Sequence, residues 1–185
     1  RIGELVAFAD QAAADGLETA VLLGMGGSSL APEVFMRTFG AADGALELIV
    51  LDTTHPATFE RVVGQLELGT TLFIVASKSG GTTETLSHLA FFWDKVPNGT
   101  QFIAITDPGT SLETQARERG FRAVFVNPED IGGRYSALSY FGLVPAALIG
   151  APLHEVLDRA EEMQTASEHT IPAAQSPGIS ASFRR

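Results

Sequence analysis

Short apolar runs alternate along the chain with longer segments in which apolar residues recur at helical spacing. The run 19–23, which stops at Gly24, is typical of a buried strand, because it is apolar at every position after the first. The same pattern predicts further strands over residues 46–51, 71–76, 101–105 and 122–126. Helical periodicity predicts helices over residues 4–14, 29–39, 56–66, 82–94, 111–119, 137–149 and 153–167.

This alternation of strands and helices predicts an α/β domain with a three-layer, doubly wound, five-stranded parallel sheet. Right-handed crossovers place the strand-to-helix loops at the carboxyl edge of such a sheet, where ligands of open α/β sheets bind. We assign residues 1–170 to this domain and residues 171–185, rich in Ser, Pro and Arg, to a tail that leads to a second domain. Because the chain begins with Arg1 rather than Met, we expect it to be a piece of a longer protein.

Charge and cysteine content narrow the classes of partner. The chain has 12 basic and 22 acidic residues, and its formal net charge of −10 argues against nucleic acid or an anionic membrane surface. An anion would therefore be held locally, by backbone dipoles and a few cations. The absence of Cys excludes disulfides and thiolate metal sites and suits the cytoplasm.

Two further features bear on cofactors and membranes. His154 and His169 have no neighbours at metal-ligand spacing, so we expect neither a metal nor a cofactor. The uncharged stretch 135–153 approaches the length of a membrane span, but it contains Ser, Gly and Pro at several positions. We therefore expect a buried helix there and no membrane partner.

The segment VASKSGGTTETL, residues 75–86, runs from a strand end through a polar loop into a helix. Ser77, Ser79 and Thr82 can each donate a hydroxyl proton to a phosphate oxygen, and the glycines between them let backbone amides approach. The first turn of a helix adds free N–H groups and a favourable dipole. The alternative is a well-capped helix in which Ser, Thr and Glu serve as N-cap and capping box, with Glu84 as the capping-box acid.

The loop GMGGSS after the first strand permits two interpretations. Gly24 and Gly26, with Asp52 at the end of the second strand, partly match a dinucleotide-binding fingerprint. Ser29 stands where the third glycine should be, so the match is weak. The hydroxyls of Ser28 and Ser29, with close backbone approach at Gly27, fit a smaller ligand.

Other polar residues of the predicted loops have structural or electrostatic interpretations. Arg134 follows two glycines and could stabilise an oxyanion or pair with a phosphate, the alternative being a surface ion pair. His88 lies among apolar residues and is expected to be packed, and His55 is expected to organise a loop. Asp52 and Asp107 are expected to act as Asx-type loop caps.

Three segments together, GMGGSSLAP, SKSGGTTET and IGGRYSALSYFG, resemble the first sugar-isomerase (SIS) domain of the phosphoglucose isomerases. These segments are similar in sequence to those of bacterial forms, including those fused to a transaldolase. LDTTHP and ITDPGTSL fit the same pattern, and the resemblance covers roughly residues 5–149. Gly80 and Gly81 depart from the Phe-Thr common in animal enzymes and follow the generic SIS pattern.

The resemblance implies a set of site residues. Those that contact the sugar phosphate would be Gly26, Gly27 and Ser28 in the first loop and Ser77, Lys78, Ser79 and Thr82 in the phosphate cradle. Arg134 takes the place of the Arg that steadies the enediolate, which makes it the catalytic candidate of this chain.

The resemblance also implies an activity. The family interconverts glucose 6-phosphate and fructose 6-phosphate through an enediol, in glycolysis and gluconeogenesis, as homodimers. Its Glu base and the His and Lys that assist ring opening lie in the second SIS domain, and no Gly-Asn-x-Glu occurs here. The chain therefore resembles the phosphate-holding half of an isomerase, inactive alone. The alternatives are an SIS module of a regulator or amino-sugar enzyme, and a nicotinamide-dependent dehydrogenase domain.

Overall fold

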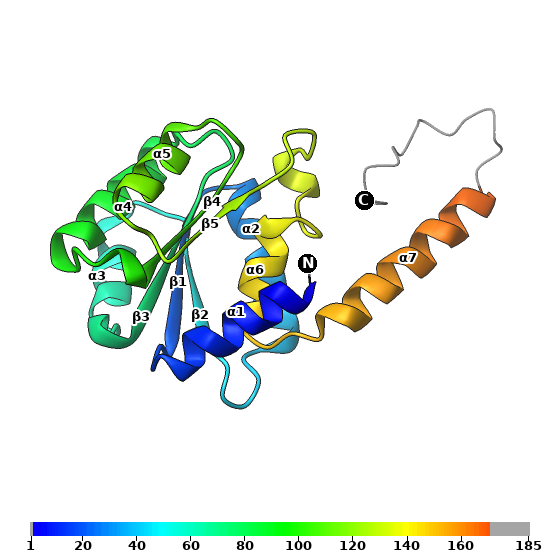
Figure 1. Ribbon diagram of the computed structural model, residues 1–185, viewed down its shortest axis with the longest axis horizontal. Helices are drawn as coiled ribbons and strands as arrows, with labels where there is room; N and C mark the ends of the chain where they lie inside the picture. Colours follow the sequence, from blue (N-terminus) through cyan, green and yellow to red (C-terminus); the bar gives the residue numbers. More distant parts are fainter. Residues whose placement is uncertain (1, 171–185) are drawn as a thin grey trace. The chain divides into compact units, whose positions relative to one another are not determined.

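The chain was studied as a computed structural model in which residues 2–170 are described (Figure 1). It divides into two compact units, Arg1–Ala151 and Pro152–Arg185. The first unit holds the sheet and all the predicted site residues. The second contains the helix α7 (Leu153–Thr170). The predicted tail, residues 171–185, lies outside the described residues.

A five-stranded parallel sheet forms the centre of the first unit, in the order β2-β1-β3-β4-β5. Its strands are β1 (Thr19–Gly24), β2 (Glu47–Leu51), β3 (Thr71–Ala76), β4 (Phe102–Thr106) and β5 (Ala123–Val126). The central strand β3 is buried at every position. This agrees with its unbroken apolar run, which is typical of a strand covered on both faces. The predicted doubly wound α/β fold is confirmed.

Helices cover both faces of the sheet, which completes the three layers (Figure 1). On one side lie α1 (Ile2–Ala14), α2 (Gly27–Phe39) and α6 (Tyr140–Leu148). On the other side lie α3 (Pro56–Val63), α4 (Thr83–Lys95) and α5 (Ser111–Glu118). The face under α4 holds a stack of aromatic rings, in which the Phe73 centroid lies 4.6 Å from that of Phe92 and 4.9 Å from that of Phe102. Burying each such ring contributes about 1.5–3 kcal/mol.

Several helix starts differ from the prediction by one to three residues, and two of these differences bear on the site. α2 begins at Gly27, two residues earlier than expected, so Pro32 lies beyond its first turn. α6 begins at Tyr140 and not at 137, because the hydroxyl of Ser139 accepts a hydrogen bond from the Phe141 N–H and caps the helix. The residues just before it form the short 3-10 helix Gly133–Tyr135.

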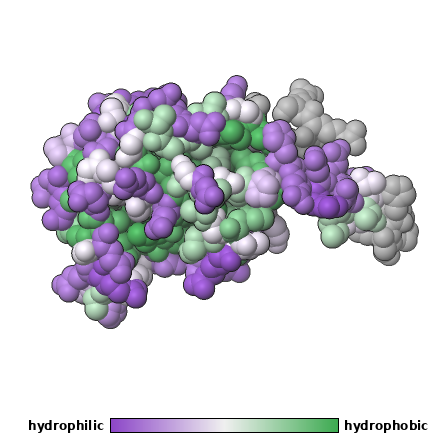
Figure 2. All heavy atoms as spheres, turned by 90° about the horizontal axis from the view of Figure 1, so that it is seen from below, coloured by the Kyte–Doolittle hydropathy of each residue, from purple (hydrophilic) through white to green (hydrophobic). Residues whose placement is uncertain are grey.

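The uncharged stretch contains the buried helix α6, as expected, with every residue from Phe141 to Leu148 buried. Within residues 2–170, no helix combines the length and apolarity that crossing a bilayer requires. Figure 2 shows hydrophilic residues over much of the visible surface, with apolar residues between them.

Candidate functional site

The two glycine-rich loops predicted as binding elements lie side by side at the carboxyl edge of the sheet. β1 pairs with β3, and their last residues, Gly24 and Ala76, are register partners. From β1 the chain continues to β2 on one side, whereas β3 leads to β4 on the other. Such a reversal of direction, here at the ends of β1 and β3, is the place where open α/β sheets bind ligands.

The loop of residues 77–82, hereafter the phosphate loop, joins β3 to α4. The Ser77 side chain is 1% exposed, and its Oγ lies 2.9 Å from Oγ1 of Thr82. Thr82 occupies the N-cap position of α4, but its side chain makes no capping hydrogen bond. The predicted capping box is therefore wrong at Thr82, because the hydroxyl is engaged by Ser77. The pairing leaves the free amides of the first turn of α4 without a side-chain cap from Thr82.

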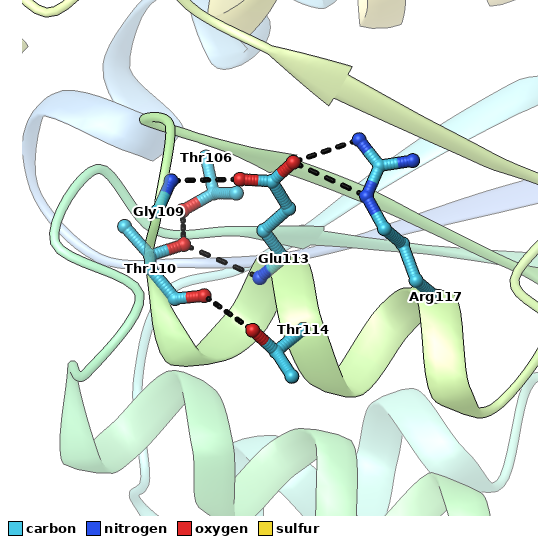
Figure 3. A network of polar contacts seen from close by, with 6 residues as sticks. All are labelled: Thr106, Gly109, Thr110, Glu113, Thr114 and Arg117. Atoms are coloured by element: carbon cyan, nitrogen blue, oxygen red, sulfur yellow. Dashed lines mark hydrogen bonds and ion pairs between the residues drawn. The ribbon is translucent and has the colours of Figure 1, made fainter.

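The next loop along the sheet, between β4 and α5, is rigidly built (Figure 3). Thr110 caps α5 by accepting a hydrogen bond from the Glu113 N–H at 3.2 Å. A carboxylate oxygen of Glu113 accepts from the Gly109 N–H at 2.7 Å, and the other pairs with Arg117 at 2.7 Å. The hydrogen bond from Arg117, followed by that from the Gly109 backbone, holds the pKa of Glu113 below its ordinary value. The start of α5 is thus closed from both sides, because Thr110 caps the helix and the Glu113 carboxylate reaches back to the residue before this cap.

This rigid loop supports the phosphate loop directly. Gly80 has a φ of +67°, and a Cβ there would lie 2.5 Å from Cβ of Thr110. The Ser111 hydroxyl donates to the Gly80 carbonyl at 3.0 Å, and the Gly80 N–H donates to the Ser77 carbonyl at 3.2 Å. Only glycine meets both the positive φ and the close approach. The departure from Phe-Thr at this point therefore has a steric reason.

The ammonium group of Lys78 is already bonded to two acceptors. Its ammonium group donates to the carboxylate of Asp107 and, at 2.9 Å, to the carbonyl of Glu129. The Asp107 N–H also donates to the Lys78 carbonyl at 3.2 Å. The expectation that Asp107 acts as an Asx-type cap is wrong, since within residues 2–170 its side chain bonds only to Lys78.

The first loop is packed against the turn that carries Arg134. A Cβ on Gly27 would lie 2.4 Å from the carbonyl oxygen of Gly133, so the two backbones touch. The Ser136 hydroxyl secures this contact by donating to the carbonyls of Gly133 at 2.7 Å and of Gly27 at 3.2 Å. The absence of a side chain at Gly27 thus serves the fold itself.

The other predicted residues of the first loop are placed as follows. Gly26 has a φ of +54° and precedes α2 as its N-cap. Ser28 is 9% exposed, with no side-chain hydrogen bond to any residue from 2 to 170. The Ser29 hydroxyl, by contrast, donates to the Gly26 carbonyl at 2.9 Å, which leaves Ser28 as the hydroxyl of this loop that is free to bind.

Arg134 is exposed and, among the described residues, takes part in no ion pair. The alternative of a surface ion pair is therefore not supported within residues 2–170. Its position is tied to the first loop through the Gly27–Gly133 contact. No hydrogen bond joins it to the phosphate loop in the described part of the chain.

The surroundings of His88 and His55 indicate structural roles for both. His88 is 2% exposed and packs against Phe59, which confirms the expected packed position. Burial, opposed in part by the Thr53 backbone and the Glu84 carboxylate, lowers the pKa of His88. His55 is exposed at the N-terminus of α3, where its N–H donates to the Thr53 hydroxyl at 3.1 Å.

Sequence reasoning missed two contacts that shape the site, the pairing of Asp107 with Lys78 and the hydrogen bonds of Ser136. Asp107 follows β4 at the same edge as Lys78, so opposite charges at adjacent strand ends could have indicated the pair. Ser136 lies 109 residues from Gly27, and no local pattern marks that contact.

The chain is similar to known proteins in both sequence and fold. A model of the family "Phosphoglucose isomerase" matches residues 7–181. The glucose-6-phosphate isomerase of Synechococcus sp. (strain JA-3-3Ab) is 39% identical over 152 residues, which are 78% of this chain and 29% of that protein. A crystal structure of a glucose-6-phosphate isomerase from Chlamydia trachomatis superposes with a TM-score of 0.68 at 28% identity, over 80% of this chain and 29% of that one.

The fold also occurs outside isomerases. The sugar isomerase domain of an RpiR transcription factor from Sphaerobacter thermophilus has a TM-score of 0.51 at 22% identity, over 90% of this chain and 84% of that one. The chain spans less than a third of the length of the curated relative, 29%. Since the family model nevertheless matches most of its residues, 7–181, the chain belongs to the phosphoglucose isomerase family.

Proposed function

We propose that this chain supplies the sugar-phosphate-binding half of a glucose-6-phosphate isomerase, which interconverts glucose 6-phosphate and fructose 6-phosphate. The observation that carries the proposal is the pair of hydroxyls Ser77 and Thr82, 2.9 Å apart at the start of α4 and not used to cap it. They lie at the reversal of strand order, in a chain of the phosphoglucose isomerase family. Family membership argues against the dehydrogenase alternative.

The phosphate would be held mainly by uncharged donors. The hydroxyls of Ser77, Ser79 and Thr82 can turn toward phosphate oxygens, and the α4 dipole favours the anion. Each hydrogen bond to a charged phosphate contributes about 1.5–3 kcal/mol. Three such bonds suffice to hold a phosphate monoester without a metal. Gly26, Gly27 and Ser28, on the neighbouring strand end, would contact the sugar.

Arg134 would act on the reacting end of the sugar. A fixed guanidinium stabilises an enediolate oxygen more than a ground-state hydroxyl, which lowers the barrier. The base that moves the proton would come from the remainder of the protein, a second SIS domain. The assembly would be a cytoplasmic homodimer that works in glycolysis and gluconeogenesis.

The test is calorimetric titration of the full-length protein with fructose 6-phosphate. The double substitution Ser79→Ala, Thr82→Ala should weaken binding about 10²- to 10⁴-fold, at about 1.5–3 kcal/mol for each of the two lost bonds. Ser87→Ala is the matched control, because that α4 hydroxyl is exposed and donates to the Thr83 carbonyl at 2.8 Å. Unchanged affinity in the double variant, with the fold intact, would refute the proposal.

A further inference from the structure

Lys78 connects three loops of the carboxyl edge. It belongs to the phosphate loop after β3, and its ammonium group reaches the Asp107 carboxylate after β4 and the Glu129 carbonyl after β5. Its side chain is 34% exposed and that of Asp107 14% exposed, so the carboxylate is more sheltered from water than the ammonium group. The pair is therefore less screened than a fully exposed surface salt bridge.

The charge of Lys78 is already neutralised before any ligand arrives. To reach a phosphate, the ammonium group would have to leave both acceptors. The Asp107 carboxylate would then remain without its cation, and its other oxygen, Oδ1, is already buried without a hydrogen-bond partner in the described structure. Leaving a sheltered carboxylate unpaired is costly. The geometry therefore favours a Lys78 that stays in place.

We propose that the side chain of Lys78 positions the phosphate loop and does not bind the phosphate, with Asp107 as its anchor. This inference rests on the proposed function, since it concerns the same phosphate site. The Lys78–Asp107–Glu129 contact, here called the lysine tie, holds the phosphate loop in the shape in which Ser77, Ser79 and Thr82 converge.

The tie also reaches toward the catalytic candidate. Glu129 lies on the segment that leads from β5 to the turn Gly133–Tyr135, which carries Arg134. That turn is fixed at its other side by the Gly27–Gly133 contact. The lysine tie thus fastens the loop that would hold the phosphate to the segment that positions Arg134. A rigid spacing between the two groups is what a reaction on a phosphorylated sugar requires.

The direction in which Asp107→Asn changes the affinity for fructose 6-phosphate separates the two possible roles of Lys78. In the full-length protein, Asp107→Asn should weaken the binding of fructose 6-phosphate roughly 3- to 30-fold, because it removes the anchor. Lys78→Met should weaken it by a similar factor, and the double variant should be no worse than the poorer single one, because both remove one tie. If Lys78 instead binds phosphate, Asp107→Asn frees it and tightens binding. Tighter binding, no change in either variant, or additive losses would overturn the inference.

Ionic strength gives a second readout. A cation that contacts phosphate contributes to the salt dependence of binding. The affinity of Lys78→Met should therefore fall with added salt as steeply as that of the wild type. A clearly shallower dependence would assign Lys78 to the phosphate and contradict the tie. Asp15→Asn is the matched control, since Asp15 pairs with Arg122 at 2.6 Å across elements outside the site, and its loss should leave binding unchanged.

Hydrogen exchange of the ligand-free protein distinguishes this inference from the proposed function. Asp107→Asn and Lys78→Met should each speed hydrogen exchange of the amides in residues 77–82 and 129–134, while strand amides stay protected. If the wild type does not bind the sugar phosphate but the loops loosen as expected, the function is wrong and the tie is right. Unchanged exchange in both loops would overturn the tie, whatever the affinity.

Discussion

Substituting Gly27 by Ala tests the contact that fixes Arg134. Gly27 is the first residue of α2, where Ala would ordinarily stabilise a helix by up to about 1 kcal/mol. Here the added Cβ would lie 2.4 Å from the Gly133 oxygen, 2.5 Å from its carbonyl carbon and 2.8 Å from its Cα. All three are backbone atoms, so the strain cannot be relieved by turning a side chain. Overpacking of this kind costs about 1–3 kcal/mol, which exceeds the helical gain.

The assay is thermal unfolding combined with turnover in the full-length protein. After the helical gain is subtracted, the net loss is about 2 kcal/mol at most, so Gly27→Ala should lower the Tm of the full-length protein by a few degrees. Displacing the Arg134 turn by about 1 Å should also lower kcat by up to about 100-fold. Gly133→Ala is the steric control, since its Cβ would lie 3.7 Å from the Gly27 Cα, an ordinary contact, and its Tm should change little. A Gly27→Ala protein as stable as the wild type would refute the reasoning.

Three further predictions follow from the same structure. Arg134→Ala in the full-length enzyme should lower kcat more than it raises KM, and a rise in KM alone would make Arg134 a ground-state ligand. Because burial lowers the pKa of His88 from its ordinary 6.5, the unfolded state binds the proton first, so the unfolding free energy should fall as pH drops from 6.5 to that lowered pKa. His88→Phe should flatten this dependence in denaturant titrations, and an unchanged slope would contradict the assignment. The chain 1–185 with fructose 6-phosphate in deuterated water should incorporate no deuterium into the sugar, because Asp107 is paired with Lys78 and Glu113 with Arg117; enzyme-like exchange would show a base within this chain.

The elements could be predicted because their patterns are local. The strand β3 was expected over 71–76 and is found at Thr71–Ala76, since an unbroken apolar run flanked by polar residues has few alternatives. The start of α6 was placed three residues early, because the apolar residues before Ser139 look helical although Ser139 is the cap.

The loops at the carboxyl edge could be located in advance, but their internal contacts could not. Thr82 reads as a helix cap in sequence, and only the fold shows that Ser77 engages its hydroxyl. The sequence suggests that Gly27 lacks a side chain only to admit a ligand, whereas the side on which a Cβ would project is occupied by Gly133. The sequence suggests Lys78 as a phosphate-binding cation, whereas in the structure its ammonium group is paired with the Asp107 carboxylate. Each difference arises from a contact between loops that are distant along the chain but adjacent in the sheet.

The most direct test of the central claim is an amide-resolved NMR titration of the chain with fructose 6-phosphate, with fructose as the comparison. The claim is that the loop after β3 binds the phosphate group and that the neighbouring loop after β1 contacts the sugar. The largest shifts should fall on residues 26–28 and 77–82, and fructose at the same concentration should leave the amides of 77–82 unmoved. Shifts centred elsewhere, or equal shifts with fructose, would contradict the claim.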